Sequence, residues 1–124
     1  MLNQYPIVAF VGVTDPGRTR TFYRDTLGLR LVSEELPFAL VFDAGGTMLR
    51  ATLLREVHPA PHTVLGWSVP DAAAAARQLE QAGVRLERYP GMEQDELGIW
   101  HAPGGAQVAW FKDPDGNTLS ITEF

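Results

Sequence analysis

Two stretches of the chain, beginning at Ile7 and Thr63, share one pattern of hydrophobic and polar positions. Each opens with a run of β-branched and aromatic residues, which predicts a strand. An aspartate follows each run, Asp15 in the first and Asp71 in the second, and a predicted helix comes after it. An aspartate in that place can accept hydrogen bonds from the free N–H groups of the first helical turn. The pattern therefore predicts the same strand–helix unit twice.

Both predicted helices end at a glycine, Gly28 or Gly83, which can adopt the left-handed conformation found at helix C-termini. The second helix also carries alanine and leucine at helical period, which predicts one apolar face. The two aspartates are 56 residues apart and the two glycines 55 residues apart. Such nearly equal spacings indicate an internal repeat.

Short strands separated by tight turns are expected after each helix. The turn sequences "DAGGT", "APGG" and "DPDGN" are rich in residues that accept turn dihedrals. The expected strands cover residues 30–34, 38–42, 47–54, 84–88, 96–101, 107–112 and 118–122. Each half is therefore predicted to be a βαβββ module, which makes the fold class α+β. The expected organisation is one domain, residues 1–124, with modules 5–55 and 62–124 and a linker, 56–61.

Composition and charge narrow the class of protein. The chain has 124 residues, no cysteine and a net charge of −5, with no run of basic residues. This charge speaks against a nucleic-acid partner, because lysine and arginine supply the main attraction to phosphate. No apolar run approaches the roughly 20 residues of a membrane span, and the first apolar run lacks the features of a signal peptide. We therefore expect a cytoplasmic protein with neither a nucleic-acid nor a membrane partner.

Two motifs carry a family resemblance: "FYRDTLGL", residues 22–29, and "AWFKDPDGNTLSI", residues 109–121. Together with the repeat, they make the sequence similar to the vicinal oxygen chelate superfamily, which includes glyoxalase I, bleomycin-resistance proteins, fosfomycin-resistance enzymes and extradiol dioxygenases. The resemblance implies two βαβββ modules that form a curved mixed sheet around a cleft. It also implies a homodimer. In metal-dependent members, four side chains on the first and last strands of the modules hold one ion.

The resemblance places these four positions at Val8, Arg50, Val64 and Ser120. Two of the side chains are hydrocarbon, one is a permanent cation, and one is a neutral hydroxyl that is a poor ligand on its own. The metals that such sites hold favour imidazole or carboxylate ligands. We therefore expect no metal and no other cofactor.

The histidines leave a second possibility open. His62 is two residues before Val64 and so points to the same face of the predicted strand. A register shift of two residues would make His62 a metal ligand. His58, His62 and His101 also lie beside prolines or turns, and this placement favours ordinary surface histidines.

Strand alternation predicts which side chains face the cleft. Leu119, Ile121 and Trp67 are expected to face the helix instead. The polar segment "YPGMEQDELG", residues 89–98, is expected to be a surface loop, with closure over the cleft as the alternative. Each aromatic residue expected in the cleft could instead be ordinary core. The residues expected to contact a ligand are Val8, Phe10, Phe42, Arg50, His62, Val64, Trp100, Trp110 and Ser120.

A cleft with aromatic walls and few polar groups suits a small organic molecule. Arg50 could hold a carboxylate or phosphate there through two parallel N–H bonds, or could pair with a nearby acid such as Asp43 or Glu56. Our hypothesis is a metal-free cleft that binds a small organic ligand, with anionic, aromatic molecules as candidates and no assigned catalytic residue. The alternative is a metal-dependent lyase, isomerase or dioxygenase of the glyoxalase type. A metal-free enzyme stays a third possibility, although the sequence offers no evident nucleophile–base pair.

Overall fold

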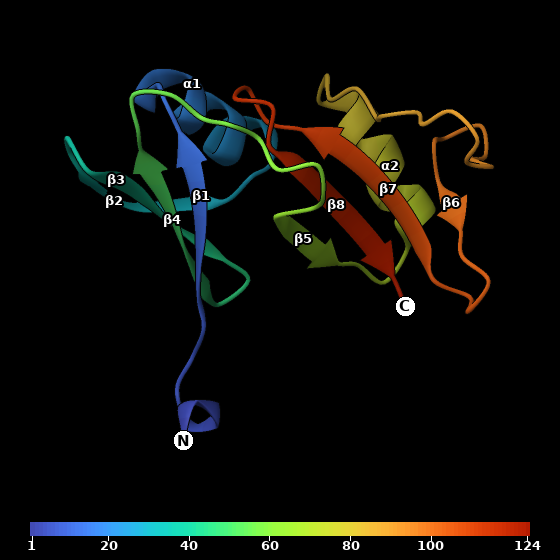
Figure 1. Ribbon diagram of the computed structural model, residues 1–124, viewed down its shortest axis with the longest axis horizontal. Coiled ribbons are helices and arrows are strands. Elements are labelled where there is room, and N and C mark those ends of the chain that lie inside the picture. Colours follow the sequence, from blue (N-terminus) through green and yellow to red (C-terminus); the bar gives the residue numbers. More distant parts are fainter. The chain divides into compact units, whose positions relative to one another are not determined.

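The computed structural model describes all residues, 1–124, and the chain divides into two compact units, Met1–His58 and Pro59–Phe124. Each unit contains one four-stranded mixed sheet and one helical region (Figure 1). This arrangement confirms the predicted α+β fold class.

The first unit forms a sheet with the strand order β1-β4-β3-β2. β1 runs parallel to β4, and the other neighbouring strands are antiparallel. A short 3₁₀ turn, Leu2–Gln4, precedes the sheet. The elements that follow are β1 (Val8–Val13), α1 (Pro16–Arg20), a π-helical segment (Thr21–Thr26), β2 (Arg30–Glu35), β3 (Ala39–Ala44) and β4 (Thr47–Leu53).

The second unit repeats this topology with the strand order β5-β8-β7-β6. Its first strand again runs parallel to its last, and the remaining pairs are antiparallel. The internal repeat expected from the sequence is therefore present in the strand order. The elements are β5 (Leu65–Ser68), α2 (Ala72–Gln81), β6 (Trp100–His101), β7 (Gln107–Lys112) and β8 (Thr118–Glu123).

Both helices begin at the aspartates that the sequence indicates. The carboxylate of Asp15 accepts a hydrogen bond from the backbone N–H of Arg18 at 2.8 Å. The carboxylate of Asp71 accepts one from the backbone N–H of Ala74 at 3.0 Å. Each bond satisfies a donor that would otherwise have no partner in the first helical turn.

The first helical region is less regular than expected. It is α-helical only over Pro16–Arg20 and continues as a π-helix, in which the N–H of Leu27 donates to the carbonyl of Phe22 at 2.9 Å. Gly28 then ends it with a φ of 80°. The wide turn contains Tyr23, which is fully buried and lies 5.7 Å from the ring of Phe42. Tertiary packing, which helical periodicity does not reveal, accompanies this departure from α-helical geometry.

The strand expected over residues 84–88 is reduced to one bridge, between Leu86 and Phe111. The side chain of Gln94 forms hydrogen bonds with backbone groups that a longer strand would have used for pairing. Its carbonyl oxygen accepts from the N–H of Tyr89 at 2.8 Å, and its amide nitrogen donates to the carbonyl of Glu87 at 2.9 Å. A side chain thus takes the place of a neighbouring strand.

The strand expected over residues 96–101 is also shorter than predicted, and β6 includes only Trp100–His101. The carboxylate of Asp95 accepts hydrogen bonds from the N–H groups of Leu97 and Ile99 at 2.9 and 3.0 Å. Local side-chain bonds of this kind compete with strand pairing.

The core of the second unit lies between its sheet and α2. Leu119 and Ile121 are buried on that side, and Trp67 stacks on Phe111 with 6.3 Å between the ring centroids. These three residues face the helix as predicted. None of the helices has the length and apolar character needed to cross a membrane.

Candidate ligand-binding site

The second sheet has an open face opposite α2, and the strand register decides which side chains reach it. Trp110 on β7 is paired with Ser120 on β8, and Ser120 is also paired with Gly66 on β5. Residues paired across a sheet share one face. Because side chains alternate along a strand, the neighbours Phe111 and Leu119 lie on the other face, where both are buried.

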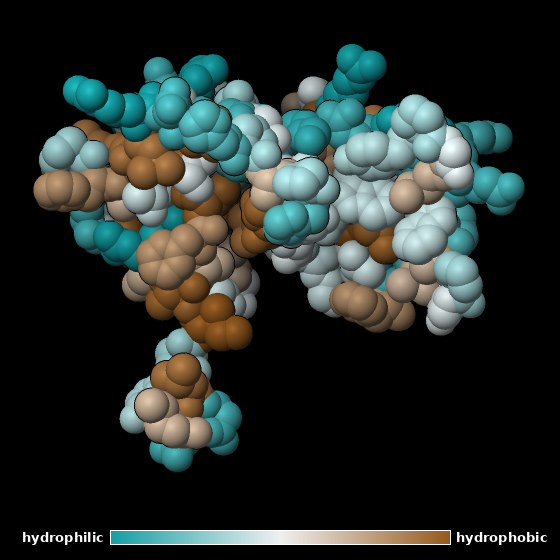
Figure 2. All heavy atoms as spheres, in the orientation of Figure 1, coloured by the Kyte–Doolittle hydropathy of each residue, from teal (hydrophilic) through white to brown (hydrophobic).

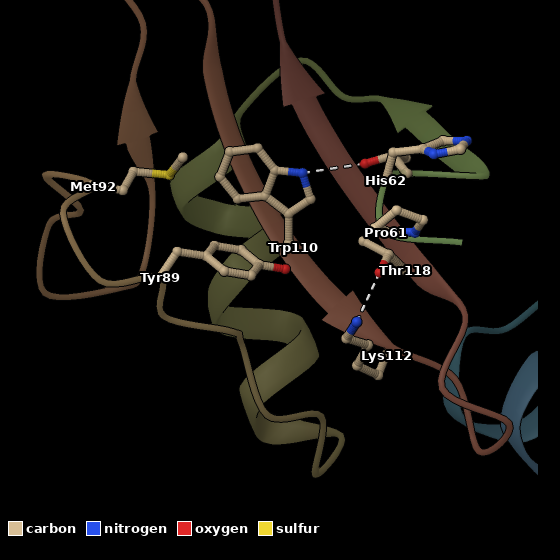
Figure 3. Close-up of a pocket in the computed structure, with 8 residues that line it drawn as sticks. Pro61, His62, Tyr89, Met92, Trp110, Lys112 and Thr118 are labelled. Carbon is tan, nitrogen blue, oxygen red and sulfur yellow. Dashed lines mark hydrogen bonds between the residues drawn. The ribbon is translucent and has the colours of Figure 1, made fainter. Parts of the chain in front are cut away.

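A hollow of about 410 Å³ lies over this open face (Figure 3). Its walls come from the segment before β5, from the loop over residues 89–98 and from the paired strands β7 and β8. This volume falls within the range of sites for small organic molecules. The residues that line the hollow are Pro61, His62, Thr63, Tyr89, Met92, Trp110, Lys112 and Thr118.

Trp110 is the largest side chain of the hollow, and its contacts hold it in one orientation. Its indole N–H donates to the hydroxyl of Thr63 at 3.1 Å, as the dashed line in Figure 3 marks. The ring of Tyr89 meets it edge-on, with centroids 5.6 Å apart and an interplanar angle of 82°. Trp100 lies 6.2 Å from it at a smaller angle of 32°. Edge-to-face and offset geometries of this kind are favourable for aromatic pairs.

Tyr89 is an un-ionised phenol in this setting. Burial, and after it the negative charge of Glu87, raises the pKa of the Tyr89 hydroxyl above its ordinary value. The wall that Tyr89 contributes is therefore neutral at physiological pH, with the hydroxyl able to donate a hydrogen bond.

Gln94 braces the loop that carries Tyr89 and Met92. In addition to its bonds with Tyr89 and Glu87, its amide nitrogen donates to the carbonyl of Gly98 at 2.8 Å. Three hydrogen bonds from one half-buried side chain tie both ends of the loop together. The loop was expected to be a plain surface segment or to close over a cleft, and in the structure it forms one wall of the hollow.

Asp95 and Arg88 add further bonds to the same loop. Arg88 donates to the backbone carbonyls of Asp95 and Glu96 at 2.8 and 2.7 Å, and His101 Nε2 lies 2.9 Å from the Asp95 carboxylate. Burial alone would raise the pKa of Asp95, but the hydrogen bonds from His101 and from backbone N–H groups outweigh it, so the pKa is lowered. Asp95 therefore stays ionised well into the acid range.

The polar end of the hollow is formed by Lys112 and Thr118, which are paired across β7 and β8. The Lys112 ammonium donates to the Thr118 hydroxyl at 2.8 Å (Figure 3). Lys112 forms no ion pair, and none of the eight residues that line the hollow is acidic. Lys112 and, when protonated, His62 are therefore the only formal charges at its surface, and both are positive.

The first sheet also has an open face, where Phe10 on β1 is paired with Arg50 on β4. The Arg50 guanidinium lies 3.1 Å from the carboxylate of Glu35, and neither Asp43 nor Glu56 is its partner. The hydrogen bond from Arg50, followed by its positive charge, lowers the pKa of Glu35. Val8 lies on the same face as Phe10, and both side chains are exposed.

The predicted position of Phe42 is wrong. Phe42 is fully buried and packs against Tyr23 on the helix side of the first sheet. Its register partner Leu49 is fully buried on that side as well, whereas the next residue, Arg50, is on the open face. Strand alternation thus separates Phe42 from Arg50, and Phe42 belongs to the core.

Sequence comparison identifies the family. The model of the Glyoxalase/Bleomycin resistance protein/Dioxygenase superfamily matches residues 6–121, which is nearly the whole chain. The chain belongs to this superfamily. A comparison with curated protein sequences finds no match.

Solved structures of superfamily proteins share the fold. A glyoxalase family protein from Enterococcus faecalis superposes with a TM-score of 0.76 at 18% identity, over 99% of this chain and 100% of that one. Lactoylglutathione lyase from Agrobacterium tumefaciens gives 0.73 at 18% identity, over 96% and 92%. A superfamily member from Sphaerobacter thermophilus gives 0.69 at 22% identity, over 98% and 99%. At these identities the similarity concerns the fold and leaves the activity open.

The residues at the four positions that the resemblance indicates for metal ligands do not fit a divalent metal. Val8 and Val64 have no donor atom, and Arg50 brings a positive charge that is already paired with Glu35. Ser120 is 6% exposed and offers one neutral hydroxyl. No group of three or more histidine, cysteine, aspartate or glutamate side chains in the chain could hold a metal ion.

The structure brings only some of the predicted site residues to the hollow. Trp110 and His62 line it, and Trp100 contacts the Trp110 ring from the side. Ser120 on β8 and Val64, the residue before β5, do not line the hollow. The N–H of Val64 donates to the carbonyl of Thr118. Of the four predicted residues in the first unit, Phe42 is in the core, and Val8, Phe10 and Arg50 lie on the open face of that unit's own sheet.

Several lining residues were not among the expected ligand contacts. Lys112 and Thr118 follow from alternation, which places both on the same strand face as Trp110 and Ser120. Tyr89 and Met92 belong to an irregular loop held by Gln94, and no periodic pattern marks such positions.

Proposed function

We propose that this superfamily member binds a small organic molecule without a metal ion, in the hollow on the open face of the second unit. The observation that carries the proposal is the lining of the hollow, in which Trp110, Tyr89 and Met92 provide an apolar wall and no metal-binding group of side chains is present. Sites for small organic ligands have this character, with aromatic walls and a few polar groups.

The ligand's apolar part packs on the Trp110 indole, between the loop and the segment before β5. The indole is fixed by Thr63 and Tyr89, and the loop is fixed by Gln94, so little order has to be created on binding. A site organised in advance loses less conformational entropy when the ligand arrives. The alternative, a metal-dependent lyase, isomerase or dioxygenase, would need imidazole or carboxylate ligands that the four positions do not supply.

The test uses ¹⁵N-labelled protein titrated with 2-naphthamide, a neutral bicyclic aromatic probe, in buffer with EDTA. The indole N–H resonances are assigned with Trp110→Phe and Trp67→Phe variants. We expect the Trp110 resonance to shift in a saturable way, while that of Trp67, which packs on Phe111 on the helix side, stays in place. Failure of Trp110 to shift, or a shift that appears only after Zn, Ni, Mn or Fe(II) is added, would refute the proposal.

We also propose that two copies of the chain form a homodimer through the open face of the first sheet. Val8, Phe10 and Met48 on this face are 39%, 61% and 44% exposed, and Figure 2 shows hydrophobic residues gathered over β1 and β4. Exposed apolar patches mark interaction surfaces. Light scattering should give twice the chain mass for the wild type and for Phe38→Glu, a control on an exposed turn, and the single-chain mass for Phe10→Glu. A monomeric wild type would contradict this proposal.

A further inference from the structure

We propose that the ligand carries a negatively charged group and that Lys112 is the residue that selects for it. The inference rests on the proposed function, because it assigns a charge and an orientation to the ligand of the same hollow. It makes Lys112 a specificity-determining residue and assigns no such role to Arg50.

Lys112 is the charged group that the hollow leaves available. Its ammonium has three donors, and its hydrogen-bond partner is the neutral hydroxyl of Thr118 at 2.8 Å. Thr118 is 5% exposed and belongs to the adjacent strand, so its hydroxyl directs the ammonium towards the sheet. At least one donor remains for an anionic group of a ligand, and a charge-assisted hydrogen bond is stronger than a neutral one.

The lining has no acidic side chain to receive a cationic ligand. The chain as a whole carries a net charge of −5, so a positively charged surface in the hollow is a local departure from the average. Arg50, the other candidate anchor, is already paired with Glu35 at 3.1 Å. An anion at Arg50 would have to displace or share that carboxylate, whereas an anion at Lys112 has no such competitor.

The spacing of Lys112 and Trp110 limits the shape of the ligand. Both side chains are on the same face of β7, two residues apart, and two residues along a strand span about 7 Å. A ring that packs on the indole therefore has the ammonium within reach of an acidic group attached directly to it or through a short chain. The ligand class is a compact aromatic carboxylate or sulfonate.

The experiment compares three probes of the same shape and different charge: 2-naphthoate, 2-naphthamide and 2-naphthylmethylamine. Dissociation constants are measured from the Trp110 indole resonance, with EDTA present and at one fixed pH for all three probes. We expect 2-naphthoate to bind about fivefold more tightly than 2-naphthamide, the size of one exposed ionic contact. The cationic probe should bind most weakly, and added salt should reduce the differences.

Three variants locate the charge effect. Lys112→Met keeps an unbranched chain of similar length without the charge, and in this variant the affinity for 2-naphthoate should be no higher than that for 2-naphthamide. Lys112→Arg should retain the preference. Arg50→Met, the matched control in the first unit, should retain it as well. A saturable shift of the Trp110 resonance with the neutral probe shows that each variant is folded and that its hollow still binds.

The outcomes separate this inference from the proposed function. If wild-type protein binds 2-naphthoate and 2-naphthamide equally through Trp110, the charge selection is wrong and the hollow stands. If the preference persists in Lys112→Met or disappears in Arg50→Met, the assignment to Lys112 is wrong. If no probe shifts Trp110, both the proposed function and this inference are overturned.

Discussion

The Arg50 guanidinium lies 3.1 Å from the Glu35 carboxylate, on the open face of the first sheet. Arg50 is on β4 and Glu35 is on β2, and β3 lies between these two strands. The resemblance to metal-dependent superfamily members would place a metal ligand at the position of Arg50. The ion pair engages the charge of Arg50, so a ligand anion there would have to displace or share Glu35.

The first prediction concerns acid stability. The hydrogen bond and the charge of Arg50 lower the pKa of Glu35 in the folded protein. Ionised Glu35 therefore contributes stability above its unfolded pKa of about 4.3, and this contribution is lost as the pH falls through the lower folded pKa. As the pH is lowered below about 5, the free energy of unfolding should therefore decrease less steeply in Arg50→Met than in the wild type. Urea unfolding at several pH values measures this slope.

Arg55→Met is the matched control, because Arg55 is exposed and forms no ion pair. It should keep the wild-type slope. Identical slopes for Arg50→Met and the wild type would show that the pair with Glu35 does not persist in solution.

The second prediction concerns the brace of the hollow. In Gln94→Leu, the carbonyls of Glu87 and Gly98 and the N–H of Tyr89 lose their partner. Each polar group left without a partner in a buried place costs about 1–3 kcal/mol, so the loop should loosen. We expect faster hydrogen exchange at the Tyr89 amide and weaker binding of 2-naphthamide.

Gln78→Leu, at an exposed position of α2, should change neither quantity. A Gln94→Leu protein that binds the probe as tightly as the wild type would mean that the loop needs no brace to form its wall.

The third prediction concerns Asp95, whose carboxylate binds the N–H groups of Leu97 and Ile99. Its pKa is lowered in the folded protein. The bonds therefore stabilise the loop above the ordinary aspartate pKa of about 3.9 and weaken as the pH falls through the folded value. Hydrogen exchange at the Leu97 and Ile99 amides should be faster in Asp95→Asn than in the wild type at neutral pH.

His101→Gln should have a smaller effect than Asp95→Asn, because it removes one partner of Asp95 and leaves the two backbone bonds. Equal protection of the two amides in Asp95→Asn and in the wild type would exclude this role for the carboxylate.

The fourth prediction concerns the close approach of β5 to β8. A Cβ atom at Gly66 would lie 2.8 Å from the Ser120 hydroxyl oxygen, which is buried. Gly66→Ala should lower the free energy of unfolding by about 1–3 kcal/mol, the usual cost of overpacking. Gly104→Ala is the control, because a Cβ there meets nothing within 4 Å. Urea unfolding that gives equal stability for both variants would contradict the tight packing.

The sequence predicted the elements whose causes are local. Asp15 and Asp71 cap the two helices, Gly28 and Gly83 end them with φ values of 80° and 88°, and the repeat is present in the strand order. Alternation along β8 correctly placed Leu119 on the helix side. These features depend on residues close to one another in the chain, where sequence patterns are informative.

The hollow could be predicted only in part, because its walls depend on contacts between distant residues. Trp110 was found by alternation, but its contact with Tyr89 depends on a loop shaped by Gln94 rather than by a periodic pattern. Phe42 was misplaced because strand register across the first sheet cannot be counted from the turn sequences alone. The partner of Arg50 was also missed, since Glu35 is 15 residues away and lies on β2, which β3 separates from β4.

The most direct test of a metal-independent site is the metal content of protein purified without a histidine tag, followed by thermal melts with EDTA and with added Zn, Ni, Mn or Fe(II). We predict substoichiometric metal and the same melting temperature in all conditions, because the four positions lack a donor set. One retained metal ion per chain, or a rise in melting temperature with one of these ions, would contradict the account. His62 would then be the first residue to test as a ligand, and the metal-dependent alternative would become the better explanation.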